Sequence, residues 1–209
     1  MKLIIFGASG GVGRALTERA LTQGHEVTAA VRNPANLPLA HPLLRVVGGD
    51  VTDPAWTQEA VEGHQMVFCT LGTGSRGPTT LYSVAARNVT QGMEAHGVRR
   101  LMFLSNFGVL GETAPNRAGA ALLLLAKLRL RHILRDHRRA LEEIRQYRWE
   151  WMAVRPMVLT DGPWTGHYRI VLEGLPAGGT HIARADVADF MLRQVSSDQY
   201  VHKIPAIAY

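Results

Sequence analysis

The sequence has little of what marks secreted, metal-binding or membrane-spanning proteins. Its single cysteine, Cys69, cannot form an internal disulfide, which fits a reducing compartment. Its nine histidines show neither an H-E-x-x-H motif nor paired cysteine and histidine spacing, so we predict no metal site. The longest apolar run, 118–126, is well under the roughly 20 residues that span a bilayer. Only four apolar residues separate Lys2 from Gly7, too few for the core of a signal peptide. We therefore expect a soluble cytoplasmic protein that does not enter a membrane.

Acidic residues are also few, 17 against 23 lysines and arginines, which gives a net charge of +6. Most of the basic excess lies in Arg117–Arg148, without helix-turn-helix or zinc-finger spacing and without interleaved aromatic residues. A solvated helix face explains this stretch better than nucleic-acid binding, so we expect no nucleic-acid partner. Its leucines fit either a helix packed in the core or in a dimer interface, or a basic amphipathic helix for a membrane or a partner protein. We favour the core or dimer interface, and we expect a monomer or a weak homodimer.

What the sequence does contain is a regular alternation of short apolar runs with longer amphipathic segments. Because parallel strands need a long return path, strands that alternate with helices indicate a parallel sheet. The expected strands are Leu3–Phe6, Glu26–Val31, Leu44–Val47, Met66–Thr70, Arg100–Ser105 and Trp151–Pro156, and the expected helices are Gly11–Gln23, Pro54–Val61, Leu81–His96 and Arg131–Tyr147. We predict one doubly wound α/β (Rossmann) domain over residues 1–209, with a mostly parallel sheet and a substrate pocket formed by its C-terminal part.

A glycine-rich loop, in "KLIIFGASGGVGRAL", joins the first expected strand to the first expected helix. Gly7 permits a tight turn, Gly10 lets the backbone approach a pyrophosphate, and Gly13 lets the helix pack close to the strand. The helix N-terminus, which includes Gly11 and Val12, presents unpaired N–H groups to phosphate charge, and the hydroxyl of Ser9 adds a donor. The loop therefore predicts a dinucleotide site.

The same loop formally matches G-x-S-x-G, the nucleophile elbow of serine hydrolases, with Ser9 as the nucleophile. Such an elbow sits on a central strand and needs an oxyanion loop from an earlier strand, and no strand precedes this one in the sequence. We therefore favour the dinucleotide site. A glycine turn that binds nothing is the remaining alternative.

The end of the second expected strand indicates which dinucleotide binds. An NAD site usually has an acidic residue there, whereas "HEVTAAVRNP" ends in Arg32 and Asn33. The guanidinium of Arg32 can hold a 2′-phosphate through charge-assisted hydrogen bonds, and Arg14 can assist it. We therefore predict NADP(H), with ordinary surface arginines as the alternative for both residues.

Further candidate residues follow the other strands, since ligands of such folds bind at the carboxyl ends of the strands. For each of them a purely structural turn role is the alternative. They are Asp50 and Val51 after the third strand, Leu71, Gly72 and Thr73 after the fourth, Ser105 and Asn106 after the fifth, and Arg155 and Pro156 at the end of the sixth.

Several segments in this order resemble a known family: "IIFGASGGVG", "VRNP", "GDVTD", "LGTG", "ARNV" and "MAVRP". They are similar to the atypical short-chain dehydrogenases with an NmrA-like NAD(P)-binding fold. Within that group, "GPTTLYSVAARNVTQGMEAHGV" and "PWTGHYRIVLEG" are most similar to the biliverdin-IXβ reductase, or NADPH-dependent flavin reductase, family. The resemblance implies a single-domain enzyme that passes hydride from NADPH to flavins such as FMN or to linear tetrapyrroles. It also implies that Arg32 selects NADPH, that Asp50 lies by the adenine, and that Leu71–Thr73 run beside the cofactor.

The resemblance is uneven around the acceptor. Asn106 aligns with a serine near the nicotinamide in that family, and Ser105 falls one place earlier. Val158 aligns with a histidine of the substrate pocket, and the segment 117–131 is longer here. These departures leave two alternatives open: a non-catalytic NADP(H)-sensing regulator, which NmrA-like relatives include, and an NADPH-dependent quinone reductase.

The catalytic candidates are Ser105, Asn106 and His137. Ordinary short-chain dehydrogenases use a tyrosine with a lysine four places later, a pair that this sequence lacks. By family analogy His137 fills the lysine position, and it lies on the apolar face of its expected helix. A core histidine is the alternative, and the one we favour. Trp164, His167 and Tyr168 are predicted to cover a flat acceptor as an apolar lid, with a structural aromatic cluster as the alternative.

Overall fold

The computed structural model describes residues 1–75, 77–112 and 117–209, the last range without the side chains of 117–122. In this part of the chain, eight strands form one sheet in the order β3-β2-β1-β4-β5-β6-β10-β8, and β7 and β9 form a small parallel pair. All neighbours in the large sheet are parallel except β10 and β8. The strands are β1 (Lys2–Phe6), β2 (Glu26–Val31), β3 (Leu44–Gly48), β4 (Met66–Cys69), β5 (Arg100–Leu104), β6 (Glu150–Pro156), β7 (Val158–Thr160), β8 (Arg169–Val171), β9 (His181–Ala183) and β10 (Ala206–Ala208).

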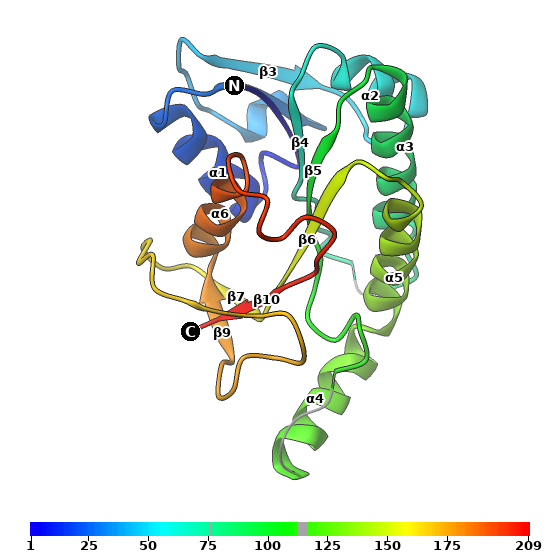
Figure 1. Cartoon of the computed structure of the whole chain (residues 1–209), viewed down its shortest axis with the longest axis vertical. Coiled ribbons are helices and arrows are strands. Elements are labelled where there is room, and N and C mark those ends of the chain that lie inside the picture. The colour runs from blue at the N-terminus through cyan, green and yellow to red at the C-terminus, as the bar shows by residue number, and fades with distance from the viewer. Residues whose placement is uncertain (76, 113–116) are drawn as a thin grey trace.

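Helices cover both faces of the large sheet (Figure 1). One face carries α1 (Gly11–Thr22) and α6 (Arg184–Arg193), and the other carries α2 (Pro54–Val61), α3 (Leu81–Ala95) and α5 (Arg131–Arg145). A short 3-10 helix spans Pro34–Asn36, and α4 (Arg117–Arg129) projects from the body of the molecule. The predicted doubly wound α/β fold is confirmed, and the expected strands and helices end within about two residues of the observed bounds.

Both faces of the central strands are buried, which explains why the inner positions of these strands are almost all apolar. In β1, Leu3 and Ile5 pack in the core beneath α1 and α6, whereas Ile4 and Phe6 pack in the core beneath α2, α3 and α5. Successive side chains of a strand point to opposite faces, so a strand between two helical layers needs no polar alternation. This arrangement leaves the loops at the carboxyl ends of the strands as the place for polar function.

The basic, leucine-rich stretch forms two helices with different surroundings. In α5 the apolar side chains are buried against the sheet and α3, as predicted. In α4, by contrast, Leu124, Leu125 and Leu128 are 57%, 64% and 56% exposed. The core interpretation is therefore wrong for these three leucines, and the dimer-interface interpretation stays a prediction. Within the described ranges, no helix combines the length and the apolar character needed to cross a membrane.

Candidate active site

A cleft of about 460 Å³ opens at the carboxyl ends of β1 and β4, where the strand order reverses. This reversal is the place where doubly wound folds bind ligands. The cleft brings together most of the residues predicted for the cofactor: Gly7, Ser9, Gly10, Gly11, Val12, Arg32, Asp50, Val51, Leu71, Gly72 and Thr73. Segments distant in the sequence therefore converge on one crevice, as the motif positions predict.

The glycines of the first loop are required by close approaches of the backbone. Gly7 has φ +82°, a conformation that residues with a side chain rarely adopt. A Cβ atom at Gly13 would lie 2.2 Å from the carbonyl oxygen of Gly7 and 2.7 Å from Oγ1 of Thr70. Gly13 does not line the cleft but lies behind it, where it lets α1 pack against the end of β1. The loop thus forms a cradle of backbone atoms, and a side chain at Gly13 would have no room behind it.

The N-terminus of α1 faces this cradle without a side-chain cap. Its N-cap residue is Gly10, and Ser9 before it is exposed. The side chain of Arg184 lies against Gly11, where a Cβ atom would be 2.4 Å from Cδ of the arginine. Free N–H groups and a nearby guanidinium together make an electropositive site suited to a pyrophosphate.

Arg184 is the main cleft residue that the sequence prediction missed. It is the first residue of α6, and its Nη1 atom pairs with the exposed carboxylate of Asp161 at 2.6 Å. A cation is unfavourable at a helix N-terminus, so its placement there was a signal that another interaction is involved. Trp56 and Leu159 also line the cleft and were missed, because nothing in their sequence context distinguishes them from core residues.

The side of the cleft formed by β2 and β3 carries opposite charges. Arg32 is exposed at the end of β2, and no ion pair involves it within the part of the chain that the structure describes. The Oδ1 atom of Asp50 accepts hydrogen bonds from the backbone N–H and the hydroxyl of Thr52, at 2.9 and 2.8 Å. These bonds hold the pKa of the Asp50 carboxyl below its usual range, and Arg32 adds a smaller effect in the same direction. Asp50 is therefore ionised and fixed in position, and Arg32 is free to meet an anion.

Arg14 lies outside the cleft. Its Nε atom pairs with Glu18 one helical turn later, at 3.0 Å, and both side chains are about half exposed. The surface-arginine alternative therefore fits Arg14 better than the predicted contact with a 2′-phosphate.

Three buried polar atoms at the end of β5 and on α5 lack hydrogen-bond partners among the described residues. They are Oγ of Ser105, Oδ1 of Asn106 and Nδ1 of His137. Buried polar atoms are nearly always paired in folded proteins, so an unpaired group marks a place where a ligand or a water molecule can complete the bonding. All three belong to the residues predicted for catalysis, but none of them lines the cleft, and their catalytic role stays a prediction.

His137 is a buried, neutral side chain. Its ring stacks on Tyr82 with 3.8 Å between centroids and meets Phe103 edge-on at 6.2 Å. Burial lowers the pKa of the imidazole to about 3, so the ring is neutral near pH 7 and cannot act as an imidazolium acid. This favours the core-histidine alternative, in which His137 is packed in the core and does not line the cleft.

Arg155 and Pro156 do not line the cleft. The guanidinium of Arg155 is fully buried, forms an ion pair with Glu112 and donates to the carbonyl oxygens of Ile204 and Leu172, at 2.8 and 3.2 Å. Pro156 is buried at the end of β6. The predicted cofactor contact of Arg155 is therefore corrected: its donors tie together the loops around β6. The partner Glu112 was missed because the ion pair joins residues far apart in the sequence.

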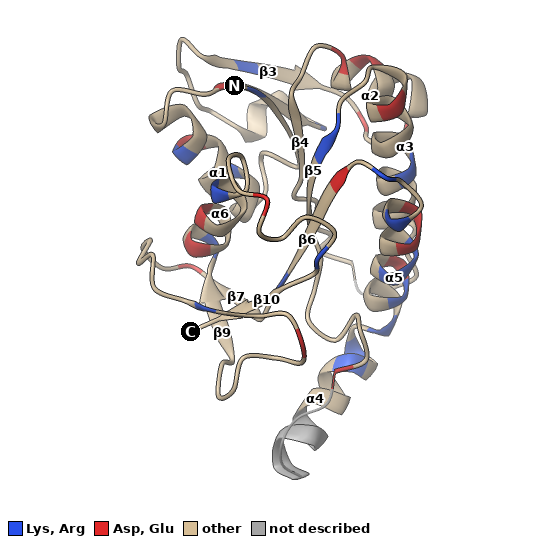
Figure 2. Cartoon of the chain, viewed as in Figure 1, with Lys and Arg blue, Asp and Glu red and all other residues tan. Residues whose placement is uncertain are grey.

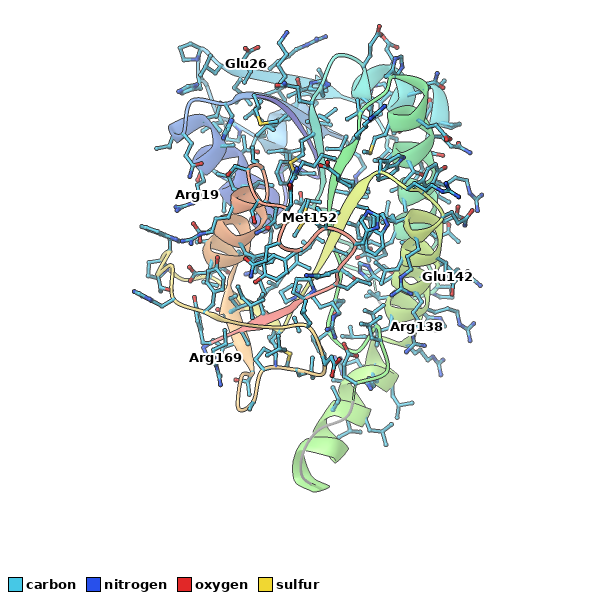
Figure 3. The ribbon with its side chains drawn as sticks, in the orientation of Figure 1. Arg19, Glu26, Arg138, Glu142, Met152 and Arg169 are labelled. Carbon is cyan, nitrogen blue, oxygen red and sulfur yellow. The ribbon has the colours of Figure 1, made fainter. Side chains whose placement is uncertain are left out.

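The predicted lid of Trp164, His167 and Tyr168 is also corrected. Tyr168 does not line the cleft, and its hydroxyl donates a hydrogen bond to Asp189 at 2.9 Å. The guanidinium carbon of Arg19 lies 4.3 Å from the ring centroid of Trp164, on the α1 and α6 side where Figure 3 labels Arg19. Asp186 of α6 accepts a hydrogen bond from the backbone N–H of Thr165, at 3.0 Å, and so fixes the loop there. His167 is exposed, and neither it nor Trp164 lines the cleft. The structural-cluster alternative is the better description.

Val158, which aligns with a substrate-pocket histidine, points away from the cleft. It lies on β7 with 53% of its surface exposed, whereas the next residue, Leu159, lines the cleft. Because side chains alternate along a strand, a shift of one residue exchanges the two faces. Leu159 therefore takes the place on the cleft that was predicted for Val158.

The fold and the cleft define a dinucleotide-binding protein with a Rossmann sheet. The chain belongs to the NAD(P)H-binding family, whose model matches residues 7–198. It is 32% identical over 130 residues to cinnamoyl-CoA reductase 1 of Oryza sativa, a match over 57% of this chain and 38% of that protein. The chain thus matches well under half the length of that relative.

Solved structures share the fold over the whole chain. A short-chain dehydrogenase/reductase of Veillonella parvula in complex with NADP has a TM-score of 0.81 and 18% identity, over 100% of this chain and 94% of that one. An anaerobillin reductase of Escherichia coli has a TM-score of 0.81 and 22% identity, over 100% and 97%. At such identities the likeness establishes the fold.

Proposed function

We propose that this protein is an NADPH-dependent reductase that transfers hydride to a flavin such as FMN or to a linear tetrapyrrole such as biliverdin. The observation that carries the proposal is the convergence of the glycine loop, Arg32 and Asp50 on one cleft at the reversal of the strand order. Membership of the NAD(P)H-binding family supports the cofactor, and the anaerobillin reductase among the neighbours agrees with a tetrapyrrole acceptor.

Each part of the cleft has a distinct binding role in this proposal. The backbone of Gly10 and Gly11 and the guanidinium of Arg184 hold the pyrophosphate. Arg32 holds the 2′-phosphate with its forked donors, and the fixed carboxylate of Asp50 accepts from the adenine amino group. The end of β2 carries no carboxylate that would select NAD instead.

The residues beyond β5 orient the reaction. Bound NADPH supplies the hydride. Oγ of Ser105 donates a hydrogen bond to the nicotinamide carboxamide or to the acceptor. The amide group of Asn106 orients the same group. A flavin nitrogen or a pyrrolic nitrogen takes its proton from water or from the Ser105 hydroxyl, because His137 is neutral and buried. Such positioning suffices for acceptors that need no strong general acid.

A second candidate is a non-catalytic NADP(H)-sensing protein. The exposed leucines 124, 125 and 128 of α4, which lie outside the cleft, favour it because a regulator needs a surface for its partner. Such a protein would bind NADPH and reduce no acceptor.

The test is NADPH oxidation by the purified protein, followed by absorbance, with FMN, biliverdin and a simple quinone as separate acceptors. We expect turnover with FMN or biliverdin. Turnover with the quinone alone would show that the acceptor is a quinone, not a flavin or a linear tetrapyrrole. NADPH binding without turnover on any acceptor would contradict the reductase and support the sensor.

A further inference from the structure

A second pocket lies beside the cleft, in the groove between the start of α3 and the first turns of α5. It encloses about 260 Å³. Figure 2 shows basic residues along α5 down to its junction with α4. We call this hollow the basic pocket; it is lined by Pro78, Thr79, Thr80, His132, Arg135 and Arg139.

The basic pocket holds positive charge that the described residues do not neutralise. Arg135 and Arg139 stand one helical turn apart, both exposed, and no carboxylate lines the pocket in the described chain. Like charges at this spacing destabilise a helix. On the same pair of helices, Arg87 does have a counter-charge, since its Nη2 atom lies 2.6 Å from Oε1 of Glu143. Other arginines of α5 also form no ion pair within the described chain, but Arg138 and Arg145 line a hollow that includes Glu142, whereas the basic pocket has no carboxylate in its lining.

Asp136, which lies next to Arg135 in the sequence, faces away from these arginines. It is 1% exposed, and its two oxygens accept hydrogen bonds from the backbone N–H of Tyr82 and the hydroxyl of Ser83, at 2.8 and 2.5 Å. Asp136 therefore caps the first turn of α3 from the neighbouring helix. Asp136 already accepts from the backbone N–H of Tyr82 at the N-terminus of α3. Anion binding by the basic pocket therefore depends on the side chains that line it.

The basic pocket and the cleft share one wall. Thr80 lines the pocket, and the next residue, Leu81, lines the cleft. The backbone N–H of Leu81 donates to Oγ1 of Thr79 at 3.1 Å, which fixes this wall. On α5, His137 faces the interior beneath the same region while Arg135 and Arg139 stay outside. An anion in the pocket is therefore held close to the part of the cleft that adjoins α3 and α5.

We propose that the basic pocket binds the anionic group, a phosphate or a carboxylate, of the hydride acceptor. This proposal rests on the proposed reductase function and narrows it to anionic acceptors. Two arginines can grip a phosphate or carboxylate through paired N–H donors, and the Thr79 and Thr80 hydroxyls add donors. FMN offers a phosphate and a linear tetrapyrrole offers carboxylates, so the chemistry is shared and the two sources are separated by experiment.

The test compares acceptors that differ only in the anion, bound to protein saturated with NADP⁺ so that no turnover is needed. Quenching of flavin fluorescence measures the Kd of FMN and of riboflavin, and a matching titration compares biliverdin with its dimethyl ester. We expect at least one charged ligand to bind about tenfold or more tightly than its neutral counterpart. Arg135→Gln combined with Arg139→Gln should abolish that preference and leave the Kd of the neutral ligand and of NADP⁺ unchanged.

Arg145→Gln combined with Arg148→Gln is the matched control, since it also removes two positive charges, from exposed sites at and just beyond the other end of α5. It should keep the preference. Equal binding of charged and neutral ligands by the wild type, or a preference that survives the double substitution, would overturn the subsite. Loss of NADP⁺ binding in the double variant would overturn it too, by assigning the pocket to the cofactor. If riboflavin is reduced and FMN binds no more tightly than riboflavin, the reductase proposal holds and the anion subsite is wrong. If FMN binds more tightly but no acceptor is reduced, the anion subsite holds and the reductase proposal is wrong.

Discussion

Polar side chains are used differently at the two halves of the sheet's carboxyl edge. Around β1 to β5, Arg32 is exposed, and polar atoms of Ser105 and Asn106 lack partners among the described residues. Around β6 to β10, Arg155 and Asp186 are buried and their hydrogen-bonding groups are occupied by other parts of the chain. The first half thus keeps polar groups without partners, whereas the second half uses most of its polar groups to hold its loops, with Arg184 of α6 as the exception that lines the cleft.

This difference explains why the C-terminal candidates fell outside the cleft. The C-terminal segments form short strands, β7 to β10, of three residues each. Such short strands make few ladder hydrogen bonds, so the loops between them need side-chain ties. Arg155, Trp164 and Tyr168 provide these ties, which stabilise the wall on which Leu159 reaches the cleft.

The largest expected effect comes from breaking the buried ion pair of the C-terminal half. Arg155→Met should lower the free energy of unfolding by about 3–5 kcal/mol, because it leaves the Glu112 carboxylate buried without its partner. Urea unfolding measures the loss. Arg155→Met combined with Glu112→Leu should recover most of it, and a single variant as stable as the wild type would show that the pair does not hold these loops.

In the N-terminal half, Gly13→Ala tests the close approach behind the cleft. We expect a loss of about 3 kcal/mol in unfolding free energy, with loss of NADPH binding, because the new Cβ would overlap the Gly7 carbonyl oxygen. Gly72→Ala is the control: Gly72 lines the cleft, yet its Cβ would meet no atom within 4 Å. Similar stability losses in both variants would refute the packing argument.

The sequence predicted the first half of the edge well because its signals are local. A glycine loop between a strand and a helix, and an arginine at a strand end, depend on neighbours within a few residues. The role of Arg155 depends on Glu112, that of Trp164 depends on Arg19, and that of Arg184 depends on Gly11. In each pair the two residues lie far apart in the sequence. Which of Val158 and Leu159 faces the cleft depends on the register of β7. A strand of three residues is too short for its sequence pattern to show this register.

His137 offers a pH-dependent test of burial at the boundary between the two halves. Burial lowers its folded pKa to about 3, whereas the unfolded chain takes up this proton near pH 6.5. The contribution of His137 to stability is therefore complete above pH 6.5 and is lost as the pH falls from there towards 3. His137→Phe keeps a stacked ring without the titration. Between pH 7.5 and 5, the wild type should lose about 2 kcal/mol more than this variant in urea unfolding. Parallel losses would mean that the histidine is not buried in its neutral form.

The smallest effect is expected at Trp164. Trp164→Ala should cost ~0.5 kcal/mol of stability, through loss of the half-exposed contact with Arg19, and should leave the KM for the acceptor unchanged. Steady-state kinetics with FMN and thermal unfolding measure the two quantities. A rise in KM with unchanged stability would restore Trp164 as a lid and remove the contrast between the two halves.

We propose that the cleft selects NADPH through Arg32, and paired titrations with the two nucleotides are the decisive test of this role. The Kd values of NADPH and NADH are measured for the wild type, for Arg32→Ala and for Arg14→Ala as the matched surface arginine. Arg32→Ala should weaken NADPH about 30-fold, by loss of charge-assisted hydrogen bonds to the 2′-phosphate, and leave NADH within about twofold. Arg14→Ala should change neither. An equal loss for both nucleotides in Arg32→Ala, or no loss at all, would show that Arg32 does not select NADPH.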